Sequence, residues 1–273
     1  MPVVLPDNSS DAAPVAPAKQ AAKRRPKSPP RKKMILRNTG RGGRVGSEQP
    51  PSRARFIAIA GNIGAGKSTL TSFLETRFGI EPFYEPNDSN PYLTDFYADM
   101  AQYAFHSQMY FLQAKFKAHL QLARLLKGNP NKVFVQDRTI YEDAEIFAAT
   151  LHRQGLLTDR DFATYTAFYQ AILDSLPKPD LLIYLRCTLH GIRRRIRHRG
   201  RLEEQDMDEV YLKTLNRAYG RWYRSYELGP SLVIDTERLD YLENLFDQVD
   251  LTTSLRAVLA GEGSPERGDK TPD

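Results

Sequence analysis

A nine-residue segment has the residue types and spacing of a phosphate-binding loop: two glycines separated by four residues, then lysine and serine. Its residues are Gly61, Asn62, Ile63, Gly64, Ala65, Gly66, Lys67, Ser68 and Thr69. Glycines allow backbone angles that point successive N–H groups at one anion, and the N-terminus of a following helix adds its positive dipole end. The lysine reaches the β- and γ-phosphates of a nucleotide, and the serine hydroxyl is a ligand for Mg²⁺. The segment therefore predicts a site for a nucleoside triphosphate.

Charged residues end two predicted strands, at the place where open α/β sheets bind ligands. Glu85 ends one extended segment, and Asp137 with Arg138 ends another. Asp137 resembles the aspartate on the magnesium side of P-loop proteins, which makes Ser68 and Asp137 the candidate metal ligands. Glu85 is a candidate base for an attacking hydroxyl, and Arg138 a candidate for stabilising charge on a phosphoryl group. The alternative for Glu85 is a surface residue beside a proline-bounded loop.

Six arginines lie within residues 193–201, and charge of this density repels itself unless an anion is bound. On a helix, Arg195 and Arg199 share a face, and Arg201 follows shortly after. These three arginines predict a lid that closes over the triphosphate and stabilises transition-state charge. A helix that binds nucleic acid is the alternative. The 26 Lys/Arg and 30 Asp/Glu of residues 56–273 disfavour it.

The segments around these residues alternate between strand and helix patterns. Short apolar runs predict strands at 56–60, 81–85, 133–137, 180–185 and 232–235. Longer segments predict helices at 68–77, 97–127, 141–154, 159–175, 207–227 and 240–259, and a basic helix that ends near 199. This alternation predicts one α/β domain, with a parallel sheet of about five strands and helices on both faces.

The basic excess of the chain belongs to its N-terminal part. The whole chain has a net charge of +6, but residues 1–55 hold 13 Lys/Arg and only 3 Asp/Glu. Residues 1–53 are rich in Pro, Ala, Gly, Lys and Arg and show no hydrophobic period, which predicts a disordered leader. This leader could bind nucleic acid or another acidic partner, or it could be a solvated tail. The predicted organisation is a leader 1–53, a folded domain 54–260 and a disordered tail 261–273.

Location is predicted from the absence of sorting signals and from cysteine usage. No stretch reaches the ~18 apolar residues of a membrane span, and the N-terminus lacks the apolar core of a secretory signal. Cys187 is the single cysteine, so an internal disulfide is impossible and a reducing compartment is expected. We therefore expect a cytoplasmic protein without a membrane span.

Four ordered blocks of the sequence resemble the deoxyribonucleoside kinase family, most closely its bacterial deoxyadenosine/deoxyguanosine kinase branch. The blocks are 61–69, 84–86 with 90–93, 137–143 and 195–204, within a likeness that covers about 56–250. The resemblance implies a P-loop kinase fold with an ATP donor and Mg²⁺. The implied reaction transfers the γ-phosphoryl group to the 5′-hydroxyl of a deoxyribonucleoside, with a purine preferred. A homodimer is also implied.

The resemblance further implies roles for individual residues. Glu85 takes the proton of the 5′-hydroxyl beside Arg138, and the lid over the phosphates consists of Arg195, Arg199 and Arg201. The implied nucleoside residues are Tyr97 and Glu204 for the 3′-hydroxyl, Gln108 for the polar edge of the base, Phe147 for stacking, and Asp143 and Lys115 close to the base. Lys115 stands where many relatives have arginine, and lysine offers no planar fork of donors.

The spacing of three of these residues makes a further prediction. Tyr97, Gln108 and Lys115 are separated by 11 and 7 residues, close to three and two helical turns. They would therefore form one polar stripe along the predicted helix at 97–127.

Three other functions remain open from the sequence. A nucleoside monophosphate kinase similar to thymidylate kinase has the same kind of loop, Asp-Arg pair and arginine lid. Such an enzyme must hold an acceptor phosphate, so an arginine would be expected in place of Glu85. A nucleotide-dependent nucleic-acid-binding protein would use the leader 1–53. A motor or switch NTPase would hydrolyse ATP without any nucleoside. The carboxylate of Glu85 favours a hydroxyl acceptor over the acceptor phosphate of a monophosphate kinase, and the other two functions stay open.

Overall fold

Six strands form one sheet in the order β1-β6-β5-β2-β4-β3. Their bounds are β1 Ile35–Arg37, β2 Phe56–Ala60, β3 Glu81–Phe83, β4 Phe134–Asp137, β5 Leu181–Arg186 and β6 Ser231–Asp235. The five strands from β6 to β3 pair in parallel, which confirms the predicted parallel sheet. Every residue of β2 is buried, as its continuous apolar sequence requires, because β2 has a neighbour on each side and helices on both faces.

The computed structural model describes residues 55–83, 90–200 and 207–237, the backbone of 35–37, and three residues at 252, 253 and 255. All of them belong to one compact unit, Met34–Asp273. Most of the helix predicted at 240–259, and the whole tail 261–273, lie outside the described residues.

Strand β1 is a sixth strand that the sequence does not predict. It pairs antiparallel with β6, with Ile35 opposite Val233. It lies within the segment 1–53, so the expectation of disorder is wrong at these three residues. Three residues are too short for a detectable period, and their order comes from pairing with β6. The rest of the leader lies outside the described residues.

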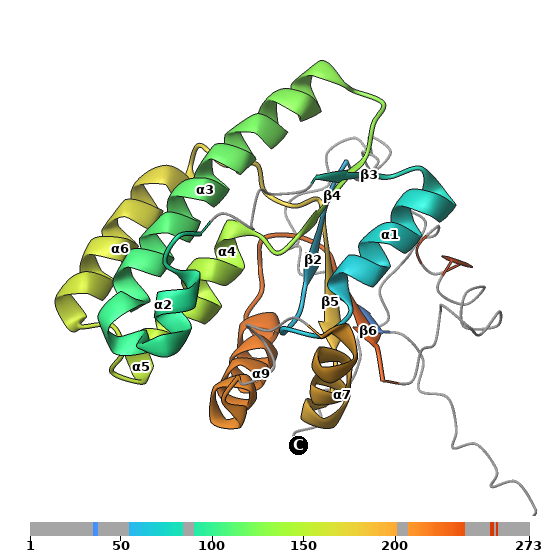
Figure 1. Cartoon of the computed structure of the whole chain (residues 1–273). Helices are drawn as coiled ribbons and strands as arrows, with labels where there is room; N and C mark the ends of the chain where they lie inside the picture. Colours follow the sequence, from blue (N-terminus) through green and yellow to red (C-terminus); the bar gives the residue numbers. More distant parts are fainter. Residues whose placement is uncertain are drawn as a thin grey trace, which may run out of the picture. The chain divides into compact units, whose positions relative to one another are not determined.

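Helices cover both faces of the sheet, as predicted. Figure 1 shows α1 on one side of the strands and α3, α4 and α6 on the other. The bounds are α1 Lys67–Phe78, α2 Leu93–Ala98, α3 Met100–Gly128, α4 Ile140–Glu142, α5 Ala149–Arg153, α6 Asp159–Leu173, α7 Leu189–Arg199 and α9 Glu209–Arg224. In the described part of the chain, none of the helices combines the length and apolar character that a membrane crossing requires.

The helix predicted at 97–127 is two helices in the structure. Asp99, between α2 and α3, has φ −144° and ψ 88°, outside the helical region. Its side chain accepts a hydrogen bond from the N–H of Gln102 at 3.0 Å and so caps α3. Because α2 ends before Asp99, Tyr97 lies on a different helix from Gln108 and Lys115. The prediction of one stripe is therefore wrong for Tyr97.

The helix predicted at 141–154 contains a stretch of π-helix. α4 passes into a π-helix at Asp143–Ala148, and α5 follows it. A π-turn is wider than an α-turn and changes the faces on which side chains lie, and such stretches are frequent at functional sites. Two predicted site residues, Asp143 and Phe147, belong to it. A search for the 3.6-residue period cannot detect this change.

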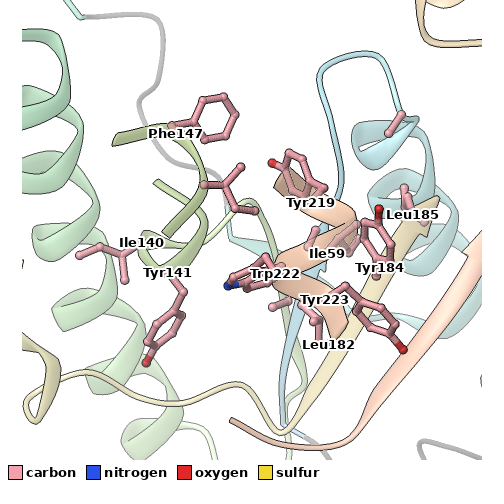
Figure 2. Close-up of a cluster of buried hydrophobic side chains, with 14 of the residues drawn as sticks. Ile59, Ile140, Tyr141, Phe147, Leu182, Tyr184, Leu185, Tyr219, Trp222 and Tyr223 are labelled. Atoms are coloured by element: carbon pink, nitrogen blue, oxygen red, sulfur yellow. The ribbon is translucent and has the colours of Figure 1, made fainter. Parts of the chain in front are cut away.

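Aromatic side chains of α9 fill the space between the sheet and the π-helix (Figure 2). The ring of Tyr219 stacks on Tyr184 of β5 with centroids 6.3 Å apart, and it meets Phe147 edge-on at 6.2 Å. Tyr223 stacks on the same Tyr184 ring at 4.8 Å. Such pairs add about 0.5–1.5 kcal/mol each beyond the burial of their area. They fix α9 against β5 and the π-helix together.

Helix α7 packs directly on the loop between β2 and α1. Gly64 of this loop has φ +74°, in the left-handed region that favours glycine. A Cβ atom at Gly64 would lie 3.0 Å from the carbonyl oxygen of Ile192 and 3.0 Å from Cγ1 of Ile196. Glycine is thus required both for the backbone angle and for the close approach of α7.

Replacing Gly64 by alanine should lower stability more than the same change at Gly79. Gly79 has a similar φ of +64°, but no atom lies within 4 Å of its Cβ position. We expect Gly79→Ala to lower the free energy of unfolding by about 1 kcal/mol through backbone strain. Gly64→Ala should lower it by roughly 1–3 kcal/mol more through overpacking. Urea unfolding measures both, and equal losses would contradict the packing of α7 on the loop.

Candidate active site

The loop at 61–69 joins the buried strand β2 to the helix α1, the context that a phosphate-binding loop requires. Gly66 is the N-cap of α1, with φ 98°, and as a glycine it provides no side chain to cap the first N–H groups of the helix. The first turn of α1 contains no acidic residue. Since these N–H groups and the helix dipole favour negative charge, this terminus is suited to an anion.

Lys67 is buried in the loop, with its ammonium group bonded to the loop backbone. Nζ donates to the carbonyl oxygens of Gly61 at 3.0 Å and Asn62 at 3.1 Å, and it lies 3.9 Å from Asp137 Oδ1. Burial lowers the pKa of Lys67 to about 8; Asp137 opposes this shift and Arg138 adds to it. A bound polyphosphate would relieve this cost, because it supplies negative charge where Lys67 lacks water.

The two predicted metal ligands lie together beside this lysine. Ser68 Oγ donates a hydrogen bond to Asp137 Oδ2 at 3.1 Å. Hydroxyl and carboxylate oxygens are the ligands that Mg²⁺ takes. Within the part of the chain that the structure describes, no group of three or more His, Cys, Asp or Glu side chains could hold a metal ion. A cation here would therefore need phosphate or water oxygens in addition to this pair.

Arg138 follows β4 directly and has an unusual backbone conformation. Its φ of +63° is the one positive φ of a non-glycine residue among those described, and it costs about 1–2 kcal/mol. The guanidinium carbon lies 4.5 Å from the centroid of the Phe147 ring, a cation–π contact. The Nε atom is buried and has no hydrogen-bond partner among the described residues. Strain combined with an unused buried donor indicates a functional position.

The charge of Arg138 is stabilised by its surroundings. Burial alone would lower the pKa of Arg138, but Tyr219 and the carboxylates of Asp143 and Glu142 outweigh burial and raise it above its ordinary value. The guanidinium group therefore stays charged at every working pH. A fixed, partly desolvated cation is the kind of group that stabilises charge developing on a phosphoryl group.

Glu142 is a buried site residue that the sequence analysis did not single out. One carboxylate oxygen accepts from the N–H of Thr139 at 2.9 Å, and the other accepts from the Tyr219 hydroxyl at 3.0 Å. Burial raises the pKa of Glu142 to about 7, against the opposing effect of Arg138. A signal was present, because Thr139 and Glu142 have the Ser/Thr-x-x-Glu spacing of a helix capping box, which the structure forms.

Asn62 connects the loop to α9. Its Nδ2 donates to the carbonyl oxygen of Leu212 at 3.1 Å. One turn further along α9, Asn216 Nδ2 donates to the carbonyl oxygen of Cys187 at 3.2 Å, just beyond β5. Since α9 also contacts Glu142, this helix supports both the loop and the Arg138 side of the site. The motif accepts any residue type at position 62, so the pattern carries no signal for this role.

The structure brings together most of the predicted nucleoside residues. Lys115 Nζ donates to the carbonyl oxygen of Arg138 at 3.0 Å and lies 3.7 Å from Asp143 Oδ2. Phe147 lies against the Arg138 guanidinium. Gln108 is buried two turns before Lys115 on α3, and its Oε1 has no hydrogen-bond partner among the described residues. Tyr97 lies on a different helix, α2, where it is half-buried against the core, and it acts electrostatically on Tyr211 of α9, as Arg138 and Asp143 do.

The two predicted lid arginines that the structure describes have different surroundings. Arg195 Nη1 donates to the carbonyl oxygen of Ala65 at 3.1 Å and to Thr236 Oγ1 at 2.8 Å. Arg199 is exposed, and its charge adds to the lowering of the Lys67 pKa that burial causes. Arg195 therefore braces the loop in this structure, whereas the charge of Arg199 acts on the phosphate site.

Three predicted site residues, Glu85, Arg201 and Glu204, lie outside the described residues. β3 ends two residues before Glu85, and its last residue, Phe83, pairs with Gln136 of β4. The carboxyl end of β3 is thus adjacent to the strand end that carries Asp137 and Arg138.

The pKa of Lys67 predicts a pH dependence of stability. The folded protein releases this proton near pH 8 and the unfolded chain near pH 10.5, so between these values the unfolded chain binds more protons. The free energy of unfolding of the wild type should therefore rise with pH across this window, by up to about 3 kcal/mol relative to Lys67→Met.

Urea unfolding from pH 7 to 10.5 measures this difference between wild type and Lys67→Met. The matched control is Lys67→Arg, which stays charged and should give a flat difference. If the free energy of unfolding of the wild type, relative to that of Lys67→Met, stayed constant or fell with pH, Lys67 would not be buried as described.

Known proteins are similar to this chain. A family model described as deoxynucleoside kinase matches residues 57–260. A deoxyadenosine/deoxycytidine kinase of Bacillus subtilis (strain 168) is 38% identical over 202 residues, which cover 71% of this chain and 91% of that protein. A deoxyguanosine kinase of Lactobacillus acidophilus is 38% identical over 227 residues, which cover 80% of this chain and 96% of that protein.

A solved structure is similar as well. The deoxyadenosine kinase from M. mycoides with bound dATP gives a TM-score of 0.62 at 32% sequence identity, over 74% of this chain and 98% of that chain. The predicted P-loop kinase fold is thereby confirmed. Because these matches span most of this chain and nearly all of each relative, the chain belongs to the deoxynucleoside kinase family.

Proposed function

We propose that this chain transfers the γ-phosphoryl group of ATP to the 5′-hydroxyl of a purine deoxyribonucleoside in nucleotide salvage. The observation that carries the proposal is the buried Oε1 of Gln108, which has no partner among the described residues and stands on the same helix as Lys115, the residue bonded to Arg138. An unsatisfied buried amide oxygen costs about 1–3 kcal/mol, which favours a ligand that donates to it. Adenine donates from N6 and accepts at N7, a pair that glutamine matches.

The names of the relatives support a purine acceptor. Two of those described above are named for deoxyadenosine and one for deoxyguanosine, although the B. subtilis relative is also named for deoxycytidine. A purine agrees with all three names. A pyrimidine agrees with two of the relatives, because the M. mycoides kinase also has a structure with the product dCMP.

On the donor side, the phosphates would lie at the N-terminus of α1. Lys67 would neutralise the β- and γ-phosphates, and Arg199 would add positive charge from α7, with Arg201 beyond it. The Ser68 hydroxyl and the Asp137 carboxylate, 3.1 Å apart, fit Mg²⁺ in chemistry and placement and would hold it. The ion would supply charge neutralisation on the phosphates.

On the acceptor side, Arg138 would stabilise charge on the transferred group while Glu85 takes the proton of the 5′-hydroxyl. Arg138 suits this role because its charge is fixed and its Nε donor is unused among the described residues. The sugar would be held by Tyr97 and Glu204. Little covalent chemistry falls to the protein, so positioning supplies most of the rate.

The acceptor can be identified by measuring ADP formation by the full chain with ATP and Mg²⁺. We expect ADP to form with deoxyadenosine or deoxyguanosine, more slowly with deoxycytidine and thymidine, and neither with dTMP nor without an acceptor. Rapid turnover with dTMP would indicate a nucleoside monophosphate kinase instead. Equal ATP hydrolysis with no acceptor present would indicate an NTPase.

The same assay tests Gln108. Gln108→Leu should raise KM for the purine nucleoside at least about tenfold and leave KM for ATP unchanged, because the polar edge of the base would then be buried without its hydrogen-bonding partner. The matched control is Gln113→Leu, on the same helix, which should change neither value. An unchanged nucleoside KM in Gln108→Leu would remove the basis of the base assignment.

The role of Glu85 predicts the effect of removing its charge. Glu85→Gln should lower kcat by about 10²–10⁴-fold, because the amide cannot accept the proton, and should leave ATP affinity nearly intact. The control Glu81→Gln changes a carboxylate four residues earlier that pairs with Lys132 at the surface, and it should have no effect on kcat. Full turnover in Glu85→Gln would show that another group is the base.

Four further features stay predictions: a homodimer, a cytoplasmic location, a disordered tail at 261–273, and a leader that could bind an acidic partner. We also expect kinase activity to persist without the leader. Cys187 is buried and unpaired, in agreement with a reducing compartment. Because β1 begins at Ile35, the truncation that tests the leader should remove residues 1–33 only. Sedimentation of that variant and of the full chain measures the assembly state.

A further inference from the structure

We propose that Lys115 is a positioning residue for Arg138, which holds the strained backbone that aims the Arg138 guanidinium at the transferred phosphoryl group. The proposal rests on the proposed function, because it takes Arg138 to act on that group. The family resemblance places Lys115 near the base, but the hydrogen bond of its ammonium group goes to the Arg138 backbone.

Three hydrogen bonds hold the backbone on both sides of Arg138. The Arg138 N–H donates to the carbonyl oxygen of Ile59 at 3.1 Å. The following peptide group is held at both ends: its N–H, from Thr139, donates to Glu142 Oε2 at 2.9 Å, and its carbonyl oxygen accepts from Lys115 Nζ at 3.0 Å. The orientation of this peptide group sets ψ of Arg138, so Glu142 and Lys115 together keep the left-handed conformation.

Of these three bonds, the one from Lys115 is the one that a helix outside the sheet and outside the capping box supplies. The bond to Ile59 continues the pairing of β4 with β2, and the bond to Glu142 belongs to the capping box of α4. Lys115 lies 23 residues before Arg138, on α3. Strand pairing forms the first bond and the capping box forms the second, whereas the third exists only because α3 packs against this strand end.

The burial of Lys115 shows that its charge serves a purpose at this place. The residue is 2% exposed, and a buried ammonium group is unfavourable unless strong partners surround it. Asp143, 3.7 Å away on the π-helix, balances its charge. An apolar residue would fill the same volume without this cost, but it would leave the Arg138 carbonyl oxygen without its donor.

The left-handed conformation matters because it determines where the Arg138 side chain points. With φ at +63°, the guanidinium lies against Phe147 and close enough to Lys67 to lower the pKa of that lysine, in addition to the effect of burial. If the Arg138–Thr139 peptide group rotated, ψ of Arg138 would change. Because a positive φ is allowed only over a narrow range of ψ, φ would then also leave +63° and the side chain would leave this position. Loss of the Lys115 bond should therefore act through Arg138.

A double-mutant cycle on the full chain tests this. We expect Lys115→Met to lower kcat about 100-fold with KM for ATP within about threefold, and to lower kcat less than about threefold when Arg138 is already alanine. A merely structural role, or direct contact with the base, would give the same loss in both backgrounds. Equal losses would overturn the proposal.

A second variant keeps the test decisive if Lys115→Met folds poorly. Lys115→Arg keeps a buried cation and a donor, and we expect it to retain kcat within about tenfold and to show the same dependence on Arg138. Amide hydrogen exchange adds a readout apart from activity: the N–H groups of Arg138 and Thr139 should exchange at least about tenfold faster in Lys115→Met, with those of β2 unchanged. Unchanged exchange would also overturn the proposal.

The failure of this proposal can be distinguished from failure of the proposed function. If the wild type does not phosphorylate deoxyribonucleosides, the function itself is wrong. If the wild type is active and Arg138→Ala lowers kcat, but Lys115→Met acts equally in both backgrounds, only the positioning role of Lys115 is wrong.

Discussion

The register between β2 and β4 brings the opposite charges of the site together. Ile59 of β2 stands opposite Asp137 of β4, and the N–H of Arg138 donates to the Ile59 carbonyl oxygen. The phosphate loop begins two residues after Ile59, so Lys67 and Arg138 must share a small region that excludes water. Burial lowers the pKa of Lys67, and Arg138 adds to this effect. The carboxylates and carbonyl acceptors around these two cations compensate for their proximity, and a phosphate group would complete that compensation.

Helix α9 contacts both sides of this region, the phosphate loop and the Arg138 side, and holds them in fixed relative positions. Asn62 bonds the loop to the backbone of α9, and two turns later Tyr219 bonds to Glu142 beside Arg138. The same Tyr219 ring stacks on Tyr184 of β5 and meets Phe147 of the π-helix (Figure 2). Rigid contacts of this kind limit relative movement of donor and acceptor, which matters because phosphoryl transfer depends on placement.

Sequence patterns predicted the parts of the fold that depend on neighbouring residues. The five parallel strands and the loop before α1 were found because their apolar runs and glycine spacing are local. The break at Asp99, the π-helix and strand β1 were missed. Each depends on something that a search of a short sequence segment cannot detect. At Asp99 a side-chain cap starts a new helix where the pattern predicts one continuous helix; at 143–148 the helical period changes; and β1 pairs with a strand about 195 residues later.

By itself, the sequence determined the family of the chain and predicted the chemistry of the site: a phosphate loop, a metal-side aspartate and an arginine after a strand. Only the tertiary structure decided what holds these groups. Glu142 was visible as a capping residue, but not as the partner of Tyr219. Lys115 was visible as a lysine in place of arginine, but not as the donor to the Arg138 backbone. Such roles arise from contacts between distant helices and strand ends, and one residue type serves many of them, so residue identity and spacing cannot specify them.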